Sequence, residues 1–124
     1  MADEITATVG LTLSKAGLKH NIATETFRRT MTGSYKEGGV QSIGFAAHEL
    51  LVISADLGSA GLGYFKNLDG TNYVELGVDV AGTFYPFAKI LANDPPNLIS
   101  LASDVIYAKA NTAAVRLLFE IFES

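Results

Sequence analysis

The sequence predicts an all-β protein, folded as an antiparallel β-sandwich or jelly roll of eight to ten short strands. Turn-forming residues recur about every 8 to 12 positions, and the segments between them are rich in β-branched and aromatic residues. The first of these segments also alternates strictly between apolar and polar residues. Such spacing of turns is typical of sandwiches and jelly rolls. Because 124 residues suit one domain, we expect a single sandwich over residues 1–124.

The first strand is predicted over residues 5–13, which read ITATVGLTL. A period of two puts one face in a core and the other toward water or a partner. Gly17 marks the turn that follows. Because an open strand edge can pair with another chain, residues 1–14 are a candidate extended or exchanged N-terminal strand that reaches a neighbouring subunit. The alternative is an ordinary first strand of the chain's own sheet.

The next segments are less regular. Residues 21–32 suit an edge strand, or one held by another chain, because neither parity is cleanly apolar. Residues 35–39, with the sequence YKEGG, are predicted as a loop. Residues 45–51 suit either a helix or a strand, and the apolar run that follows favours a strand over residues 49–54.

Turn signals become regular from residue 62 onward. Residues 63–68 and 72–78 are predicted to form a hairpin around Asp69-Gly70, a dipeptide that tolerates positive φ. Ala81-Gly82 is the next turn, and residues 83–91 the next strand. Pro86 within that strand indicates an edge or a bulge, because proline has no amide hydrogen to donate.

A loop over residues 93–97 precedes the last strands, predicted at residues 105–109 and 115–122. Residues 113–123 also suit a helix, because Arg116, Glu120 and Ser124 are spaced by four. The β-branched and aromatic content of this segment favours the strand.

The composition indicates subunit contacts. Charged residues make up 18% of the chain, against about 25% in ordinary soluble domains. The mean hydropathy is +0.26. Two aromatic pairs, Tyr64-Phe65 and Phe84-Tyr85, are adjacent in the sequence. Neighbouring side chains of a strand point to opposite faces, so one member of each pair points away from the core. We therefore expect part of the surface to be buried against other subunits.

Several classes of protein are excluded by composition. The chain has no cysteine, which excludes disulfide scaffolds and thiol chemistry. The net charge of −4 and scattered Lys and Arg residues argue against a nucleic acid partner. No run approaches the roughly 18 to 20 apolar residues of a membrane span, so no membrane contact is expected. The start, Met1-Ala2-Asp3-Glu4, lacks the basic residues of a secretory signal.

Candidate catalytic and metal-binding side chains are few. His20 and His48 are 28 positions apart, and even with Glu49 they match no metal-binding spacing. Ser59 lacks the GxSxG pattern of a nucleophile elbow. We therefore predict no catalytic residues and no enzyme activity.

Two further motifs suggest ligands only weakly. The glycines at positions 58, 61 and 63 echo a phosphate-binding loop, but the sequence after them is typical of a strand rather than of a helix. Asp69, Asn72 and Glu75 offer oxygen atoms for calcium without the spacing of a calcium loop. We predict no cofactor-binding residues, no metal ligands and no cofactor.

The second half of the chain resembles a known group of proteins. Residues 65–77 (FKNLDGTNYVELG), 84–89 (FYPFAK) and 106–117 (IYAKANTAAVRL) are similar to runs in small virion proteins of tailed bacteriophages. The similarity extends over residues 62–122. It implies a β-sandwich structural protein of the virion, and the size and acidity suit a capsid decoration, or cement, protein. Such proteins commonly sit on the outer shell as trimers and bridge neighbouring capsomers.

The resemblance also implies partners and a location. The partners would be further copies of the chain, as a homo-oligomer and most simply a trimer, and the major capsid protein. The location would be the capsid surface of the virion, after assembly in the host cytoplasm. A small tail, neck or fibre-associated subunit with receptor or glycan contacts is the alternative. The resemblance implies no active-site residue for either role.

Overall fold

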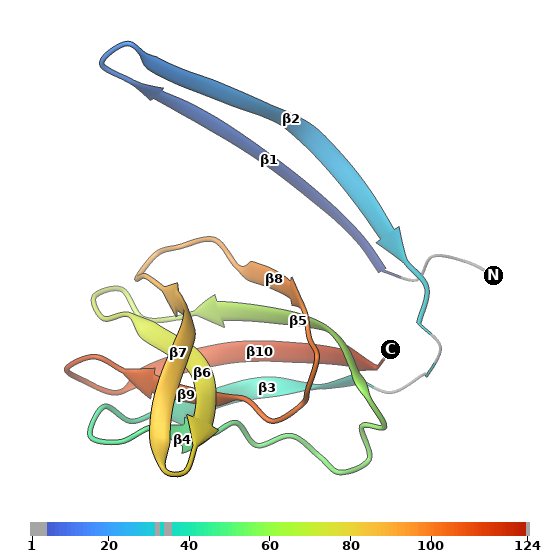
Figure 1. Ribbon diagram of the computed structural model, residues 1–124, viewed down its shortest axis with the longest axis vertical. Helices are drawn as coiled ribbons and strands as arrows, with labels where there is room; N and C mark the ends of the chain where they lie inside the picture. The colour runs from blue at the N-terminus through green and yellow to red at the C-terminus, as the bar shows by residue number, and fades with distance from the viewer. Residues whose placement is uncertain (1–4, 32, 34–35, 124) are drawn as a thin grey trace. The chain divides into compact units, whose positions relative to one another are not determined.

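The computed structural model describes residues 5–31, 33 and 36–123, and Figure 1 shows their arrangement within each part of the chain. These residues form ten strands, all paired antiparallel, with no helix among them. They divide between residues 32 and 33 into two compact units. The all-β prediction is therefore confirmed, with a strand count at the upper end of the expected range.

The second unit is an eight-stranded sandwich. One sheet has the order β3-β10-β5-β8 and the other has the order β4-β9-β6-β7. Consecutive strands switch sheets at every step except from β6 to β7, which is the strand order of a jelly roll. The strands are β3 (Lys36–Ile43), β4 (Glu49–Leu50), β5 (Ala60–Asn67), β6 (Val74–Val80), β7 (Thr83–Ile90), β8 (Asn97–Ser100), β9 (Tyr107–Ala110) and β10 (Val115–Glu123).

The core lies between these two sheets. Strand β10 places Val115, Leu117, Phe119 and Ile121 in it, each at most 3% exposed, while Arg116 between them is exposed. The other sheet contributes Val74, Leu76, Ile90, Ala108 and Ala110 to the same cluster. Burying a large apolar side chain stabilises the fold by about 1.5–3 kcal/mol. This alternating burial confirms a strand, and not a helix, at the C-terminal end.

The β6–β7 hairpin follows the sequence prediction. Its turn is Ala81-Gly82, with φ of +54° and +88°, and β7 is an edge strand. The register passes from Leu76↔Ala88 to Gly77↔Pro86, so Phe87 is an extra residue. Pro86 is therefore found both on an edge and beside a bulge, where its missing amide hydrogen costs no ladder bond.

The predicted Asp69-Gly70 hairpin is wrong, because β5 and β6 belong to different sheets. The segment between them is a crossover wrapped around two polar side chains. The buried Asn67 amide donates to the carbonyls of Asn72 (2.8 Å) and Ile90 (3.1 Å). The Asp69 carboxylate accepts the amide hydrogens of Thr71 and Asn72 at 2.9 and 2.6 Å. These bonds close a wider loop than a two-residue turn.

The prediction of a loop over residues 35–39 is also wrong for residues 36–39, because these residues belong to β3 and pair with β10. One of the glycines that suggested a turn, Gly38, instead permits a close approach of β3 to β10. A Cβ on Gly38 would lie 2.6 Å from the carbonyl oxygen of Phe119. Tyr35 lies outside the described residues.

Residues 45–51 contain no helix, and the strand predicted over 49–54 ends at Leu50. Beyond it, the Gln41 side chain replaces a neighbouring strand. Its amide nitrogen donates to the Leu50 carbonyl at 3.2 Å, and its amide oxygen accepts the Val52 amide hydrogen at 2.9 Å.

The first unit is a hairpin of β1 (Ile5–Lys15) and β2 (Leu18–Arg29). Its turn is Ala16-Gly17, with φ of +44° and +87°, which confirms the turn predicted at Gly17. The core face expected on residues 5–13 is not found within the hairpin itself, where Val9, Leu11 and Leu13 are 59, 57 and 42% exposed. A two-stranded sheet has no second layer of its own. Of the candidate N-terminal strand over residues 1–14, residues 1–4 lie outside the described residues, and the remainder belongs to β1, which pairs with β2 and so is not a lone strand.

Candidate functional site

The β1–β2 hairpin, which we call the arm, contains a β-bulge that decides which residues share a face. The register passes from Val9↔Glu25 to Leu11↔Ile22, so β2 holds one extra residue there. A bulge of this kind reverses the parity of the strand beyond it. As a result Ile22 and Phe27 lie on the same face, although one number is even and the other odd. This explains why neither parity of residues 21–32 is apolar in the sequence.

The bulge gathers most of the large apolar side chains of the arm on one face. We define the apolar face by the apolar residues that register places on one side: Ile5, Ala7, Val9, Leu11, Leu13, Leu18, Ile22 and Phe27. Register places Lys15, His20, Glu25 and Arg29 on the same side. Leu18 and Ile22 of β2 are 61 and 44% exposed, comparable with the large apolar residues of β1 on the same face. A shallow hollow of about 420 Å³ lies on this face. Exposed apolar patches rimmed by polar residues mark interaction sites.

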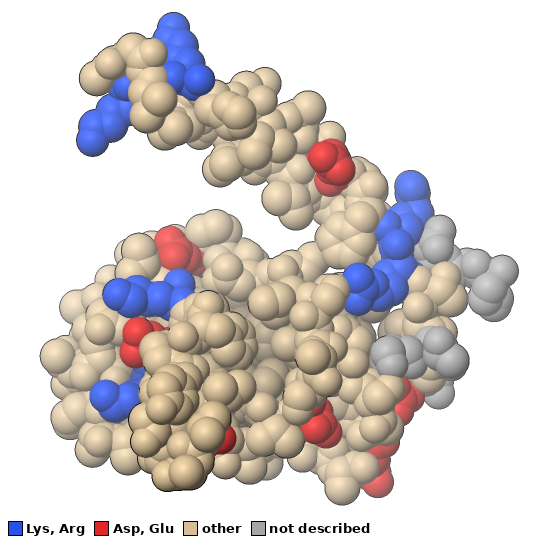
Figure 2. All heavy atoms as spheres, viewed as in Figure 1, with Lys and Arg blue, Asp and Glu red and all other residues tan. Residues whose placement is uncertain are grey.

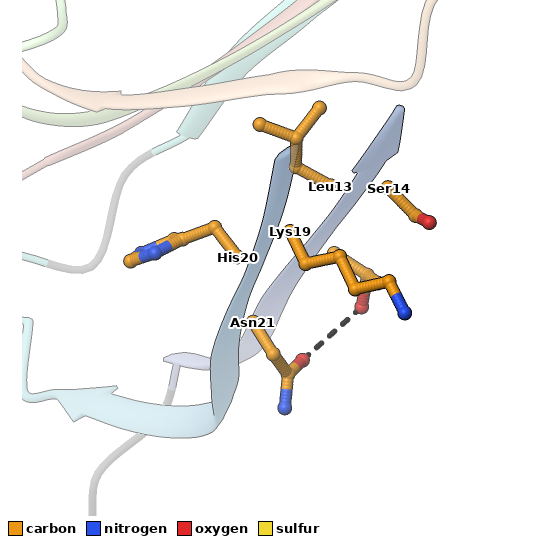
Figure 3. Close-up of a pocket in the computed structure, with 6 residues that line it drawn as sticks. Leu13, Ser14, Lys19, His20 and Asn21 are labelled. Carbon is orange, nitrogen blue, oxygen red and sulfur yellow. Dashed lines mark hydrogen bonds between the residues drawn. The ribbon is translucent and has the colours of Figure 1, made fainter. Parts of the chain in front are cut away.

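The opposite face of the arm is polar. The hydroxyl groups of Thr8 and Thr26 form a hydrogen bond of 3.0 Å, and the Thr12 hydroxyl donates to the Asn21 side-chain oxygen at 3.2 Å. Figure 3 shows the region near the turn, where His20 and Leu13 lie on one side of the ribbon and Lys19, Ser14 and Asn21 on the other. These residues line a second shallow hollow of about 340 Å³. The arm is therefore amphipathic across its thickness.

Charge is distributed unevenly between the two units. Residues 5–31 contain four Lys or Arg and one acidic residue, a net charge of +3, and Asp3 and Glu4 bring the sequence of the first unit, residues 1–32, to +1. Residues 33–124 contain five Lys or Arg and ten acidic residues, a net charge of −5. Figure 2 shows the basic side chains of the arm at its turn and at its opposite end. They are Lys15, Lys19, Arg28 and Arg29.

The sandwich holds a separate cluster around His48. Its Nε2 lies 2.5 Å from Oδ2 of Asp79, and its ring stacks on Phe84 and meets the edge of Tyr107. The hydrogen bond from His48 lowers the pKa of Asp79, and the Gly82 amide hydrogen and the charge of His48 contribute in the same direction. The pair ties the turn end of the β6–β7 hairpin to the segment before β4.

This pairing differs from the one that the sequence suggests. Glu49, the neighbour of His48, instead accepts the Gly44 amide hydrogen at 2.8 Å. Asp79 was missed because it is 31 positions away from His48 and no spacing rule connects them. The other histidine, His20, belongs to the arm. Within the part of the chain that the structure describes, no group of three or more His, Cys, Asp or Glu side chains could hold a metal ion.

The other side chains weighed as ligands have structural contacts. Backbone hydrogen bonds from Asn72 and Thr71 lower the pKa of Asp69 and occupy its carboxylate. Asn72 accepts the Thr112 hydroxyl at 3.0 Å. The glycine-rich segment is held by Glu123, which accepts the Gly58 amide hydrogen at 2.7 Å, and then continues into β5.

The fold and sites define an all-β jelly roll with an amphipathic two-stranded arm. No protein-family model, curated protein or solved structure matches the chain. Among the described residues there is no helix with the length and apolarity to cross a membrane. Of the surfaces described above, the apolar face of the arm is the strongest candidate for a functional site.

Proposed function

We propose that the protein is a non-catalytic structural subunit, specifically a decoration protein that binds the outer shell of a phage capsid and stabilises contacts between capsomers. The observation that carries the assembly role is the exposed apolar face of the arm. Apolar surface is stabilised by about 25 cal/mol for each Å² removed from water, so a partner that covers this face gains substantial binding free energy. The arm is thus suited to assembly.

The sandwich supports the same proposal. Its two sheets enclose one apolar core, so the sandwich has a hydrophobic core of its own. Its most prominent polar groups, the His48–Asp79 pair and the Asn67–Asp69 network, hold its loops together. Jelly rolls serve viral capsid and lectin domains among others, so the fold alone leaves the role open. The resemblance of residues 62–122 to small virion proteins supports a structural role in a virion, and the size and acidity of the chain favour the shell within it.

The proposed mechanism is mechanical. A shell under internal pressure fails first at the joints between its capsomers. A subunit that binds only the closed joint raises the free energy of opening by mass action. Repeating a modest contact over many symmetric positions then gives high avidity without any single strong contact.

Quantitative mass spectrometry of particles purified from the source tests the proposal. The amount of this chain is measured against the major shell protein. A ratio near one, or a simple fraction of it, is expected for a decoration protein. A handful of copies per particle would instead indicate a tail, neck or fibre subunit, and absence from the particles would overturn the virion role.

A further inference from the structure

We propose that the apolar face of the arm docks on the sandwich of a second copy of this chain, so that copies exchange arms. The inference deepens the proposed function and rests on it only for its biological setting. It names both the surface that builds the oligomer and its occupant. Three observations carry it: the exposed face, the distribution of charge, and the size of the arm.

The distribution of charge selects the sandwich as the docking surface. Residues 5–31 carry +3, or +1 when Asp3 and Glu4 of the same unit are counted, and residues 33–124 carry −5, so an arm and a sandwich from two copies attract each other. Two arms would repel. Register places Arg29 at one end of the apolar face and Lys15 at the other. Two apolar faces brought together in either direction would therefore set cations against cations at their ends, away from Glu25, which register places opposite Val9 on the same face.

The size of the arm favours reciprocal exchange. Strand β1 has 11 residues, so at about 3.3 Å per residue the arm is about 36 Å long and, with two strands, about 10 Å wide. One docked face would then bury about 700 Å², counting both surfaces, which is less than a specific interface requires. Two exchanged arms would bury about 1,400 Å², within the roughly 1,200–2,000 Å² of stable complexes.

Zero-length cross-linking of the full chain identifies the docking surface. A carbodiimide joins lysines to carboxylates, and mixing ¹⁴N- and ¹⁵N-labelled chains distinguishes links between copies from links within one. We expect mixed-isotope links from Lys15 or Lys19 to carboxylates in residues 36–123. Links of one isotope only would show that the arm docks on its own sandwich. Mixed links between Lys19 and Glu25 would show arm-to-arm pairing. Either result overturns the proposal.

The apolar face is tested by a register pair of substitutions, Leu11→Thr with Ile22→Thr, which keep residues suited to strands. Sedimentation equilibrium should show the dissociation constant of the oligomer raised about tenfold or more. The matched control is Thr8→Ser with Thr26→Ser on the polar face, which should leave that constant unchanged. Rising salt should weaken association of the unaltered chain, because opposite charges meet.

Several outcomes separate this inference from the proposed function. A monomer at all concentrations, or equal association by both double variants, overturns arm exchange. An unchanged thermal unfolding midpoint of the sandwich shows that the substitutions acted only on the arm. If copies exchange arms in solution but the chain is absent from purified particles, the shell role is overturned and arm exchange stands. If the chain is present over the whole shell but is a monomer in solution, arm exchange is overturned and the shell role stands.

Discussion

At the scale of single residues, Asn67 is the polar side chain on which the crossover between the sheets depends. It is 2% exposed, donates to two carbonyls and accepts the Asp69 amide hydrogen at 2.8 Å. Asn67→Ala would leave buried groups without partners, at a cost of about 1–3 kcal/mol for each group that stays dry. We expect urea denaturation to show a loss of about 2–4 kcal/mol in the free energy of unfolding. Asn97→Ala, at an exposed position, is the control. A loss below about 1 kcal/mol for Asn67→Ala would contradict this role.

The Asp79 carboxylate gives stability a dependence on acid pH. Its folded pKa lies below the ordinary value of 3.8, because His48 and the Gly82 amide hydrogen stabilise the charged form. Its contribution is therefore fully present above that ordinary value and is lost as the pH falls through the lower folded pKa.

Asp79→Asn removes this dependence. Urea midpoints of both proteins are measured from pH 5.5 to pH 2.5. The stability advantage of the unaltered chain over the variant should stay constant near pH 5.5 and shrink as the pH falls toward 2.5. A constant difference over the whole range would show that the carboxylate has no lowered pKa in the folded state.

At the scale of elements, Gly77 permits the bulge that shapes the β6–β7 hairpin. A Cβ there would lie 2.4 Å from the Tyr85 carbonyl oxygen and 2.7 Å from the Phe84 ring. Because backbone cannot yield as a flexible side chain can, Gly77→Ala should destabilise the fold by about 1–3 kcal/mol in chemical denaturation. Gly70→Ala is the matched control, since its Cβ would meet nothing within 4 Å. Equal effects of the two substitutions would contradict a steric role for Gly77.

The same elements show what the sequence can predict. The Ala81-Gly82 turn and the final strand follow from local rules, because two positive-φ residues and an alternating apolar face act over a few positions. Asp69-Gly70 fits the same local rule, but the hairpin that it predicts is not formed. Its neighbouring strands enter different sheets, and the Asn67 side chain, rather than the dipeptide, fixes the path between them.

The candidate site was predictable only in part. The alternation of residues 5–13 correctly indicates an amphipathic strand, but its partner contains a bulge that a strict period of two cannot represent. Ile22 and Phe27 are assigned to one face only once the register is known. The His48–Asp79 pair depends on β6 and the segment before β4 meeting across the fold, which no local pattern encodes.

At the scale of the whole molecule, the two units should differ in stability. The sandwich has its own core, whereas the arm is a two-stranded sheet, which is marginally stable in water. If a second copy covers the arm, the protection of its amide hydrogens from exchange depends on protein concentration. Protection of β10 does not, because this strand pairs on both sides and is buried in the sandwich.

Hydrogen exchange measured by mass spectrometry over a concentration series separates these cases. In dilute protein we expect β1 and β2 to exchange far faster than β10, and their protection to rise as the oligomer forms. The Leu11→Thr, Ile22→Thr variant should keep the arm in fast exchange at concentrations where the unaltered arm is protected. An arm equally protected at every concentration would be stabilised by its own chain. Since two strands alone cannot supply that protection, the arm would then be docked on its own sandwich and unavailable for exchange.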